Sequence, residues 1–201
     1  MTIQLDQLSF DQSTGLLPAV IQDASTRAVL MVAYQNREAV EKTLTTGELW
    51  FYSRSRSELW HKGATSGNVL TLVDAQPDCD NDTILYQVTP AGPACHTGSE
   101  TCFGAPGFTL GHLEKTIRDR QSAPTPDSYT GKLLADQNLL FTKISEEAAE
   151  VLKAVRKAEG NQRLAEETAD LFYHTLVLLA EQGVTLDEVK KVLAARHKGS
   201  A

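Results

Sequence analysis

The stretch GLLPAVIQDASTRAVLMVAYQN, residues 15–36, decides the fold of the first half of the chain. An apolar run, the polar turn DASTR and a second apolar run follow one another, which is the pattern of a β-hairpin. Three more segments rich in aromatic and β-branched residues predict strands: 48–55, 69–76 and 83–90. A short helix that starts after Asn36 and ends near Gly47 is predicted between them. These patterns predict an α+β domain dominated by strands.

The apolar period changes to that of helices in the second half. The segment FTLGHLEKTIRDRQ, residues 108–121, can place three apolar side chains on one helical stripe: Leu110, Leu113 and Ile117. A helix is expected at about 129–159, and a Gly-Asn break separates it from a second helix that runs to about Gln182. Thr185 and Glu188 form a capping box for a third. This half is predicted to be all-α, of the helical-bundle type.

The segment SAPTPDS, residues 122–128, contains two prolines and is the best linker in the chain. We therefore predict two domains, residues 1–121 and 122–201. No internal repeat or low-complexity tract interrupts either of them.

Composition narrows the function classes. The 201 residues are 41% hydrophobic and carry a net charge of −7, which argues against general nucleic-acid binding. The sequence shows no signal peptide and no apolar run of membrane-spanning length, so we expect a cytoplasmic protein without a membrane partner. Its three cysteines are an odd set, which fits a reduced metal site better than a disulfide scaffold.

The segment PDCDNDT, residues 77–83, alternates aspartates with other residues. If it were an extended strand, its three carboxylates would share one face and its thiol would point to the other. Carboxylates suit Mg²⁺ or Mn²⁺ and a thiolate suits zinc, so two metals are predicted, with these ligands: Asp78, Asp80 and Asp82 for the hard cation and Cys79 for zinc. A solvated turn is the alternative. A calcium loop is excluded because Thr83 and Thr89 replace its Gly and Glu.

Two further cysteines lie in the loop GPACHTGSETCF, residues 92–103. Cys95 and Cys102, together with Cys79, offer three thiolates, and three protein ligands with an open position are typical of catalytic zinc. Zinc lowers the pKa of a bound water to about 7. His96 is predicted to act as general base or proton shuttle. The alternative is that the cysteines only pack as small apolar side chains.

The densest cations of this half lie in SRSRSELWHKGATSGN, residues 53–68. Cationic side chains and a tight turn can hold a phosphate, and an aromatic ring can stack on a base. The predicted substrate-binding residues are Arg54, Arg56, Trp60, Lys62, Ser66, Gly67 and Asn68. A solvated hairpin loop is the alternative reading.

Residues 29–68, with DCDND at 78–82 and the cysteine loop at 92–103, resemble the phosphoribosyl-AMP cyclohydrolases of histidine biosynthesis. This resemblance covers roughly residues 1–120. It implies water attack on the purine ring of phosphoribosyl-AMP, which breaks the N1–C6 bond. It also implies zinc on the three cysteines, shared across a homodimer interface, and Mg²⁺ on the three aspartates. His96 is implied to transfer a proton. Ala64 replaces the family's usual Glu in KGETSGN, and Gln35 its usual Met.

Acidic residues recur on two of the predicted helices: Glu146, Glu147 and Glu150 on the first, Glu167 and Asp170 on the second. Spacings of three and four residues place such acids on one helical face. If the helices pack antiparallel, the acids converge, and carboxylates so close need a divalent cation such as Mg²⁺. A solvated acidic face is the alternative.

This pattern, with SYTGKLL at 128–134, Lys143 and ADLFYHTLVLL at 169–179, resembles the phosphoribosyl-ATP pyrophosphatases of the all-α nucleoside triphosphate pyrophosphohydrolases. The resemblance covers about residues 122–197. It implies hydrolysis of phosphoribosyl-ATP between the α- and β-phosphates. The five acids become metal ligands or water activators, with Glu147 and Glu150 as catalytic candidates, and Lys143 contacts a phosphate.

The two resemblances complete each other, because the second half makes the substrate of the first. They imply a bifunctional enzyme of histidine biosynthesis that acts on phosphoribosyl-ATP and phosphoribosyl-AMP. Two alternative functions stay open. One is a zinc-stabilised interaction module fused to a helical dimerisation domain, and the other gives the helical half a general housecleaning activity on nucleoside triphosphates.

Overall fold

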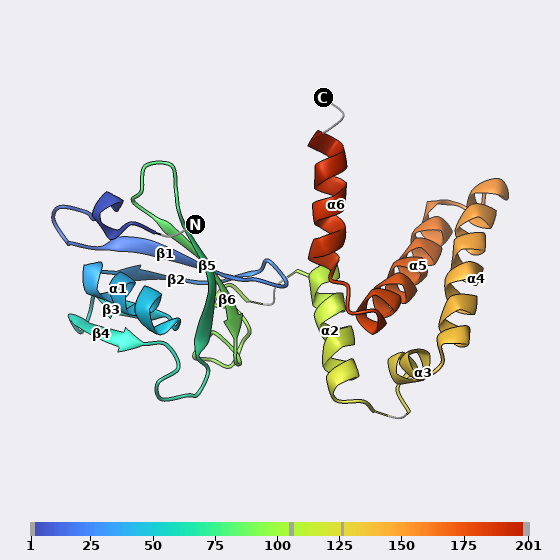
Figure 1. The fold of residues 1–201 in the computed structure, drawn as a ribbon, viewed down its shortest axis with the longest axis horizontal. Coiled ribbons are helices and arrows are strands. Elements are labelled where there is room, and N and C mark those ends of the chain that lie inside the picture. Colours follow the sequence, from blue (N-terminus) through green and yellow to red (C-terminus); the bar gives the residue numbers. More distant parts are fainter. Residues whose placement is uncertain (1–2, 105–106, 126, 199–201) are drawn as a thin grey trace. The chain divides into compact units, whose positions relative to one another are not determined.

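The computed structural model describes residues 3–104, 107–125 and 127–198 of the chain. It divides into two compact units, Met1–Phe108 and Thr109–Ala201 (Figure 1). The division lies before the helix that contains Ile117, and not after residue 121 as expected from the prolines. Ile117 is fully buried in the hydrophobic core of the second unit, so packing assigns this helix to the second unit.

The main sheet of the first unit has four strands in the order β2-β1-β6-β5. They are β1 (Leu17–Asp23), β2 (Val29–Gln35), β5 (Leu70–Pro77) and β6 (Ile84–Pro90). The predicted hairpin is confirmed, since β1 and β2 pair antiparallel. The pair β5 and β6 is also antiparallel. β1 and β6 join the two hairpins in parallel at the centre of the sheet.

A second, two-stranded sheet pairs β3 (Trp50–Ser53) with β4 (Glu58–His61). The short 3-10 helix η1 spans Leu5–Gln7, and α1 spans Arg37–Thr46. Both predicted ends of α1 are confirmed. The Asn36 side chain accepts a hydrogen bond from the N–H of Ala39 at 2.9 Å, and Gly47 takes the left-handed conformation that glycine adopts without strain.

Alternating side chains of β1 and β6 lie at the centre of the sheet and contribute to the core of the first unit. Leu17, Ala19 and Ile21 of β1 are buried, as are Ile84 and Tyr86 of β6, because successive residues of a strand point to opposite faces. The residues of this unit that are predicted to bind metal lie on the turn before β6 and in the loop after it, and all of them are exposed except Cys95, which is half-buried.

The second unit is all-α, as predicted. Its helices are α2 (Leu110–Ser122), α3 (Tyr129–Ala135), α4 (Gln137–Arg156), α5 (Asn161–Glu181) and α6 (Leu186–Lys198). One helix was expected over about 129–159, and this expectation was wrong. Asp136 has extended backbone angles, and its side chain accepts a hydrogen bond from the N–H of Leu139 at 3.0 Å, which ends α3 and caps α4.

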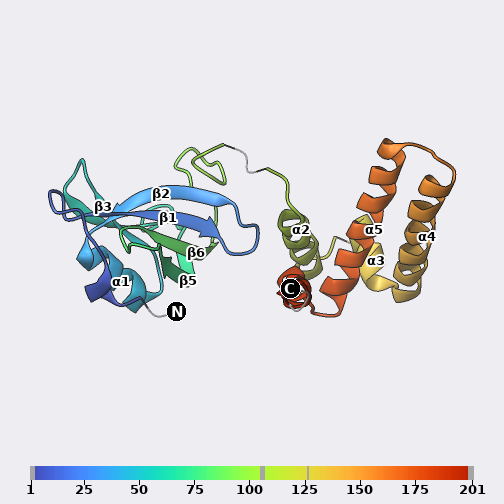
Figure 2. The ribbon, with the colours of Figure 1, turned by 90° about the horizontal axis from the view of Figure 1, so that it is seen from above.

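Helices α4 and α5 run antiparallel and side by side (Figures 1 and 2). Buried side chains from α2, α3, α4 and α5 form one core: Ile117, Leu133, Leu140, Leu176, Val177 and Ala180. The predicted capping box of α6 is present, since Thr185 N–H donates to Glu188 Oε2 at 2.7 Å and Glu188 N–H donates to Thr185 Oγ1 at 3.2 Å. None of the described helices is long and apolar enough to cross a membrane.

Candidate active sites

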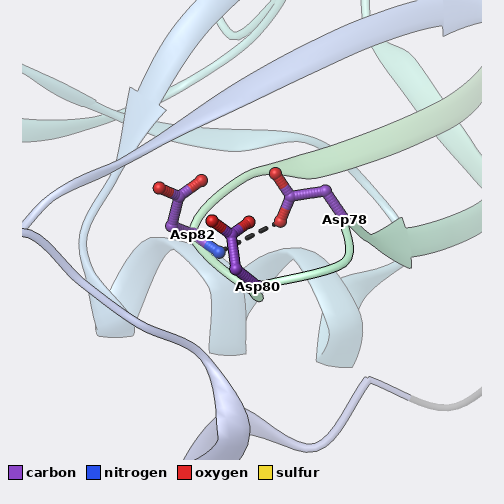
Figure 3. A group of neighbouring side chains, drawn as sticks. All are labelled: Asp78, Asp80 and Asp82. Carbon is purple, nitrogen blue, oxygen red and sulfur yellow. Dashed lines mark hydrogen bonds between the residues drawn. The ribbon is translucent and has the colours of Figure 1, made fainter.

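The three predicted aspartate ligands lie on the turn between β5 and β6. One carboxylate oxygen from each of Asp78, Asp80 and Asp82 lies within 4.8 Å of the others (Figure 3). All three residues are exposed. Carboxylate oxygens at this spacing suit a hard cation such as Mg²⁺.

The segment that carries these aspartates is a turn, so the expectation of an extended strand was wrong. β5 ends at Pro77, and Asp78 Oδ1 accepts hydrogen bonds from the N–H groups of Asp82 and Thr83, both at 3.1 Å. Although desolvation acts in the opposite direction, these hydrogen bonds hold the pKa of Asp78 below its usual value. Asp78 is therefore a carboxylate at neutral pH. It is the turn, and not strand alternation, that gathers the acids.

The loop after β6 carries the other two cysteines. Its first turn is closed by the N–H of Cys95, which donates to the carbonyl of Ser99 at 3.1 Å. Its last turn is attached to β2, because the N–H of Cys102 donates to the carbonyl of Leu30 at 2.7 Å. The buried hydroxyl of Thr101 donates to the carbonyl of Gly104 at 2.6 Å. Backbone and side-chain bonds thus fix both thiols on one loop.

The two thiols of this loop have opposite pKa shifts. The Thr97 hydroxyl donates to Cys95 Sγ at 3.1 Å and lowers the pKa of Cys95. Burial, and then the neighbouring Cys95, raise the pKa of Cys102, while the Lys62 ammonium acts to lower it. Cys95 is therefore the thiol that ionises more readily, and thiolate is the form that binds zinc.

Cys79 is exposed on the aspartate turn. In the described part of the chain, no group of three close metal-ligand atoms contains a cysteine. The three predicted zinc ligands therefore do not form one site within a single chain, whereas Cys95 and Cys102 influence each other directly.

A cavity of about 460 Å³ lies beside the cysteine loop. Four predicted substrate-binding residues line it, namely Trp60, Lys62, Ser66 and Asn68. Cys95, His96 and Cys102 line the same cavity. Lys62 is buried, and its Nζ donates to the carbonyl of Asn68 at 3.2 Å. The structure thus joins a cation, a base-sized aromatic ring and two thiols around one space.

The other three predicted substrate-binding residues, Arg54, Arg56 and Gly67, are not among the residues that line the cavity. The Arg54 guanidinium lies 3.9 Å from the centre of the Tyr34 ring, and Arg56 pairs with Glu58 at 3.0 Å. Gly67 shapes the turn before β5 through its positive φ of 76°. Within one chain these three do not line the cavity.

The second unit carries a separate group of acids. Oxygens of Glu147 on α4 and of Glu167 and Asp170 on α5 lie within 4.8 Å of one another. Glu167 is only 3% exposed and forms an ion pair with Arg163, one helical turn earlier. Burial, and then the negative charge of Asp170, raise the pKa of Glu147. Carboxylates held this close repel one another unless a cation lies between them.

Two of the five predicted acids are not part of this group. Glu146 pairs with Lys143 at 2.7 Å, and Glu150 pairs with Lys153 at 2.7 Å. Each pair lies within α4, where residues three apart are neighbours. The structure therefore brings together Glu147 and the two acids of α5 and leaves the other two on lysine partners.

Two known protein families match this sequence. A family described as phosphoribosyl-AMP cyclohydrolase matches residues 31–104, and one described as phosphoribosyl-ATP pyrophosphohydrolase matches residues 110–197. The histidine biosynthesis bifunctional protein HisIE of Bacillus subtilis is 46% identical, over 96% of this chain and 97% of that protein. The protein of the same name from Gloeobacter violaceus is 48% identical, over 94% of this chain and 90% of that protein.

The chain belongs to the HisIE family. The predicted pair of activities is confirmed: the first unit is a phosphoribosyl-AMP cyclohydrolase and the second a phosphoribosyl-ATP pyrophosphohydrolase of histidine biosynthesis. Each family match falls within one structural unit. The two groups of close carboxylates in this HisIE protein therefore lie in different enzymatic units.

Two residues of this HisIE protein replace the family's usual ones, and they lie in different surroundings. Ala64 is exposed at the rim of the cyclohydrolase cavity. Gln35 is fully buried, where its Nε2 donates to the carbonyl of Trp50 at 2.6 Å and to Thr43 Oγ1 at 3.1 Å. Gln35 thus joins β2, α1 and β3 through hydrogen bonds that a Met side chain does not form.

Two histidines near the sites were not among the predicted site residues. His61 lines the cyclohydrolase cavity, stacks on Trp50 and lies 2.7 Å from Glu48. His174 is buried against the pyrophosphohydrolase acids, with its Nδ1 2.8 Å from the carbonyl oxygen of Asp170. The spacing of four residues from Asp170 was the available signal for His174, because it places both on one helical face.

Proposed function

We propose that the cyclohydrolase unit uses zinc held by Cys79, Cys95 and Cys102, with the ligands contributed by two copies of the chain. Support comes from the thiol pair on one loop and from the separation of Cys79 from it. When bound, zinc supplies a water of lowered pKa as the nucleophile. A homodimer is required because one chain supplies only two of the three thiolates at one place.

The residues around the cavity take the remaining roles in ring opening. Lys62 lies beside the thiols as a buried cation, and we assign it to substrate phosphate or to the charge that develops on the ring. Trp60 offers a ring face to the purine. His96, exposed next to Cys95, is assigned the transfer of a proton to the leaving ring nitrogen. The aspartate turn is assigned to Mg²⁺.

For the pyrophosphohydrolase unit we propose Mg²⁺ on Glu147, Glu167 and Asp170. The burial of Glu167 beside two further carboxylates supports this assignment, because an ion pair with Arg163 compensates only one of the three charges. When bound, Mg²⁺ polarises the phosphate oxygens of phosphoribosyl-ATP. Glu147 is the carboxylate whose pKa is raised, and we assign it to the attacking water.

The observation that carries this proposal is that each unit has its own hydrophobic core and its own donor set, with thiols and an aspartate turn in the first and helix carboxylates in the second. Cys102→Ala is expected to abolish ring opening and to leave hydrolysis of phosphoribosyl-ATP near normal. Glu147→Ala is expected to do the reverse. Turnover of both substrates by each variant, together with metal analysis of the purified protein, makes the test. Loss of both activities in either folded variant contradicts separate sites.

We also propose that the enzyme acts in the cytoplasm. Its cysteines are free thiols, and thiols persist in a reducing compartment. Fractionation of cells followed by an assay of both activities tests this proposal, and recovery of the activities outside the cytoplasmic fraction contradicts it.

A further inference from the structure

Two adjacent residues of α3 are hydrogen-bonded to two adjacent residues of α5. The Tyr129 hydroxyl lies 2.9 Å from His174 Nε2, and the Thr130 hydroxyl lies 2.9 Å from the hydroxyl of Tyr173. Thr130 and His174 are buried. The start of α3 is therefore fixed against α5, one helical turn beyond the Asp170 carboxylate.

The direction of the Tyr129–His174 hydrogen bond follows from the other side of the imidazole. His174 Nδ1 lies 2.8 Å from the carbonyl oxygen of Asp170, which can only accept a hydrogen bond. Nδ1 therefore carries a proton, and in this Nδ1–H tautomer Nε2 is an acceptor. The Tyr129 hydroxyl must then donate to Nε2. Its oxygen is left with lone pairs alone for any other neighbour, so it can accept a hydrogen bond and cannot donate a second one.

The neighbour with a proton to donate is Lys143. On α4, Lys143 lies four residues before Glu147 and so on the same helical face. On α5, His174 lies four residues after Asp170 in the same way. Tyr129 interacts electrostatically with Lys143, Glu147 and Asp170, and Lys143 interacts with Tyr129 in turn. Because α4 and α5 run antiparallel, Lys143 and His174 lie on the same side of the acid group, and the Tyr129 hydroxyl lies against His174 on that side.

Lys143 has a competing partner. Its Nζ lies 2.7 Å from Glu146, which is exposed and outside the acid group. A lysine side chain is long and rotates freely about its stem, so this ion pair alone does not direct the ammonium toward the acids. A fixed acceptor at the edge of the acid group supplies that direction.

We propose that Tyr129, oriented by His174, is a positioning residue that holds the Lys143 ammonium beside the carboxylates Glu147, Glu167 and Asp170. The ammonium is then ready for a phosphate oxygen of the triphosphate substrate. This inference rests on the proposed function of that site. It assigns to the buried imidazole a role in orientation, with no proton transfer to substrate.

The test is kinetic and has a matched control. Tyr129→Phe removes the hydroxyl that bonds His174, whereas Tyr173→Phe removes the neighbouring hydroxyl, which bonds Thr130 on the same helix pair. We expect Tyr129→Phe to lower kcat/KM for phosphoribosyl-ATP by about tenfold or more, the range of a charge-assisted hydrogen bond. Tyr173→Phe is expected to change it by less than about twofold. Cyclohydrolase turnover of the same proteins serves as an internal standard.

A double-mutant cycle separates positioning from general loosening of the helices. In a Lys143→Met protein, which is itself expected to be impaired, Tyr129→Phe should have little further effect, because the ammonium that it positions is gone. A purely structural role of Tyr129 instead gives effects that multiply. His174→Leu is a second variant, and it should be as impaired as Tyr129→Phe and add nothing to it.

The outcomes distinguish this inference from the proposed function. Multiplicative effects, a normal Lys143→Met enzyme, or equal losses in Tyr129→Phe and Tyr173→Phe overturn the inference. If Glu147→Ala leaves hydrolysis of phosphoribosyl-ATP intact, the acid site itself is wrong. If Glu147→Ala is inactive and Tyr129→Phe is normal, only the positioning role is lost.

Discussion

Replacing Thr101 with Val should weaken zinc binding, although Thr101 is not a ligand. Its hydroxyl is buried, donates to the carbonyl of Gly104 at 2.6 Å and accepts from the N–H of Phe103 at 3.0 Å. Cys102 lies inside this turn, and its own N–H is bonded to Leu30 of β2. The Thr101 side chain therefore closes the turn that presents the thiol.

The size of the effect follows from these two hydrogen bonds. Valine has nearly the shape of threonine, so Thr101→Val removes both bonds without opening a cavity. Each contributes about 1 kcal/mol net. Without both bonds, the ordered conformation of the zinc-free loop should be less favourable by about 2 kcal/mol. Since about 1.4 kcal/mol corresponds to a tenfold change in affinity, zinc affinity should fall by up to about 30-fold.

Competition with a chromophoric chelator measures the zinc affinity. Thr116→Val is the control, because the Thr116 hydroxyl donates only to a carbonyl of its own helix, that of His112, at 2.9 Å. At saturating zinc the cyclohydrolase activity of Thr101→Val should return, and the hydrolysis of phosphoribosyl-ATP should be unchanged throughout. Zinc affinity equal to that of the unaltered protein, in a folded Thr101→Val variant, would refute the reasoning.

Three further predictions concern charge and packing. Lys62→Met should raise the pKa of Cys102, because the Lys62 ammonium lowers it, and alkylation of this thiol in zinc-free protein should become slower. Hydrogen bonds from neighbouring hydroxyls hold the pKa of Asp11 at about 2. The stability it contributes is therefore complete above its unfolded value of 3.8, so the loss of melting temperature in Asp11→Ala should shrink as the pH falls toward 2. Gly131→Ala should destabilise the protein by about 1–3 kcal/mol, since a Cβ there would lie 2.8 Å from the Thr125 carbonyl.

Each of these predictions has a clear contrary result. An alkylation rate unchanged by Lys62→Met, beside an equal rate in a Lys42→Met control, means that the cation does not act on Cys102. A pH-independent difference between Asp11→Ala and the unaltered protein removes the role of that carboxylate. Normal stability of Gly131→Ala, measured by denaturant unfolding beside Gly107→Ala, means that the loop before α3 can move away.

Local signals made part of the fold predictable. Asn36 and Gly47 mark the ends of α1, and Thr185 with Glu188 caps α6, because each of these interactions joins residues only a few positions apart. The parallel pairing of β1 with β6 joins strands about sixty residues apart. No periodicity within either strand specifies that partner, and the strand order was therefore not predicted.

Two wrong predictions, the single helix over residues 129–159 and the strand over residues 77–83, share one physical cause. Asp136 was read as one more position in a long helix, although its side chain caps α4 and its backbone is extended. Asp78 was read as part of a strand, although its side chain accepts two backbone N–H bonds and closes a turn. In both places a short aspartate side chain competes with regular structure for backbone donors, which a count of apolar periods does not detect.

The difference between helices and loops explains which ligand residues could be predicted to lie close together. In a helix, a spacing of three residues fixes a shared face, and Glu167 and Asp170 do lie together on α5. On α4 the spacing favoured Glu146 and Glu150, whereas the packing of α4 against α5 brings only Glu147 to these two acids. In a loop, spacing fixes no direction. Cys95 and Cys102 meet because Thr101 and the carbonyl of Leu30 hold their loop against β2. Cys79 lies on another turn, apart from these two thiols. No spacing rule connects that turn with the loop of Cys95 and Cys102, so their meeting at one zinc stays a prediction.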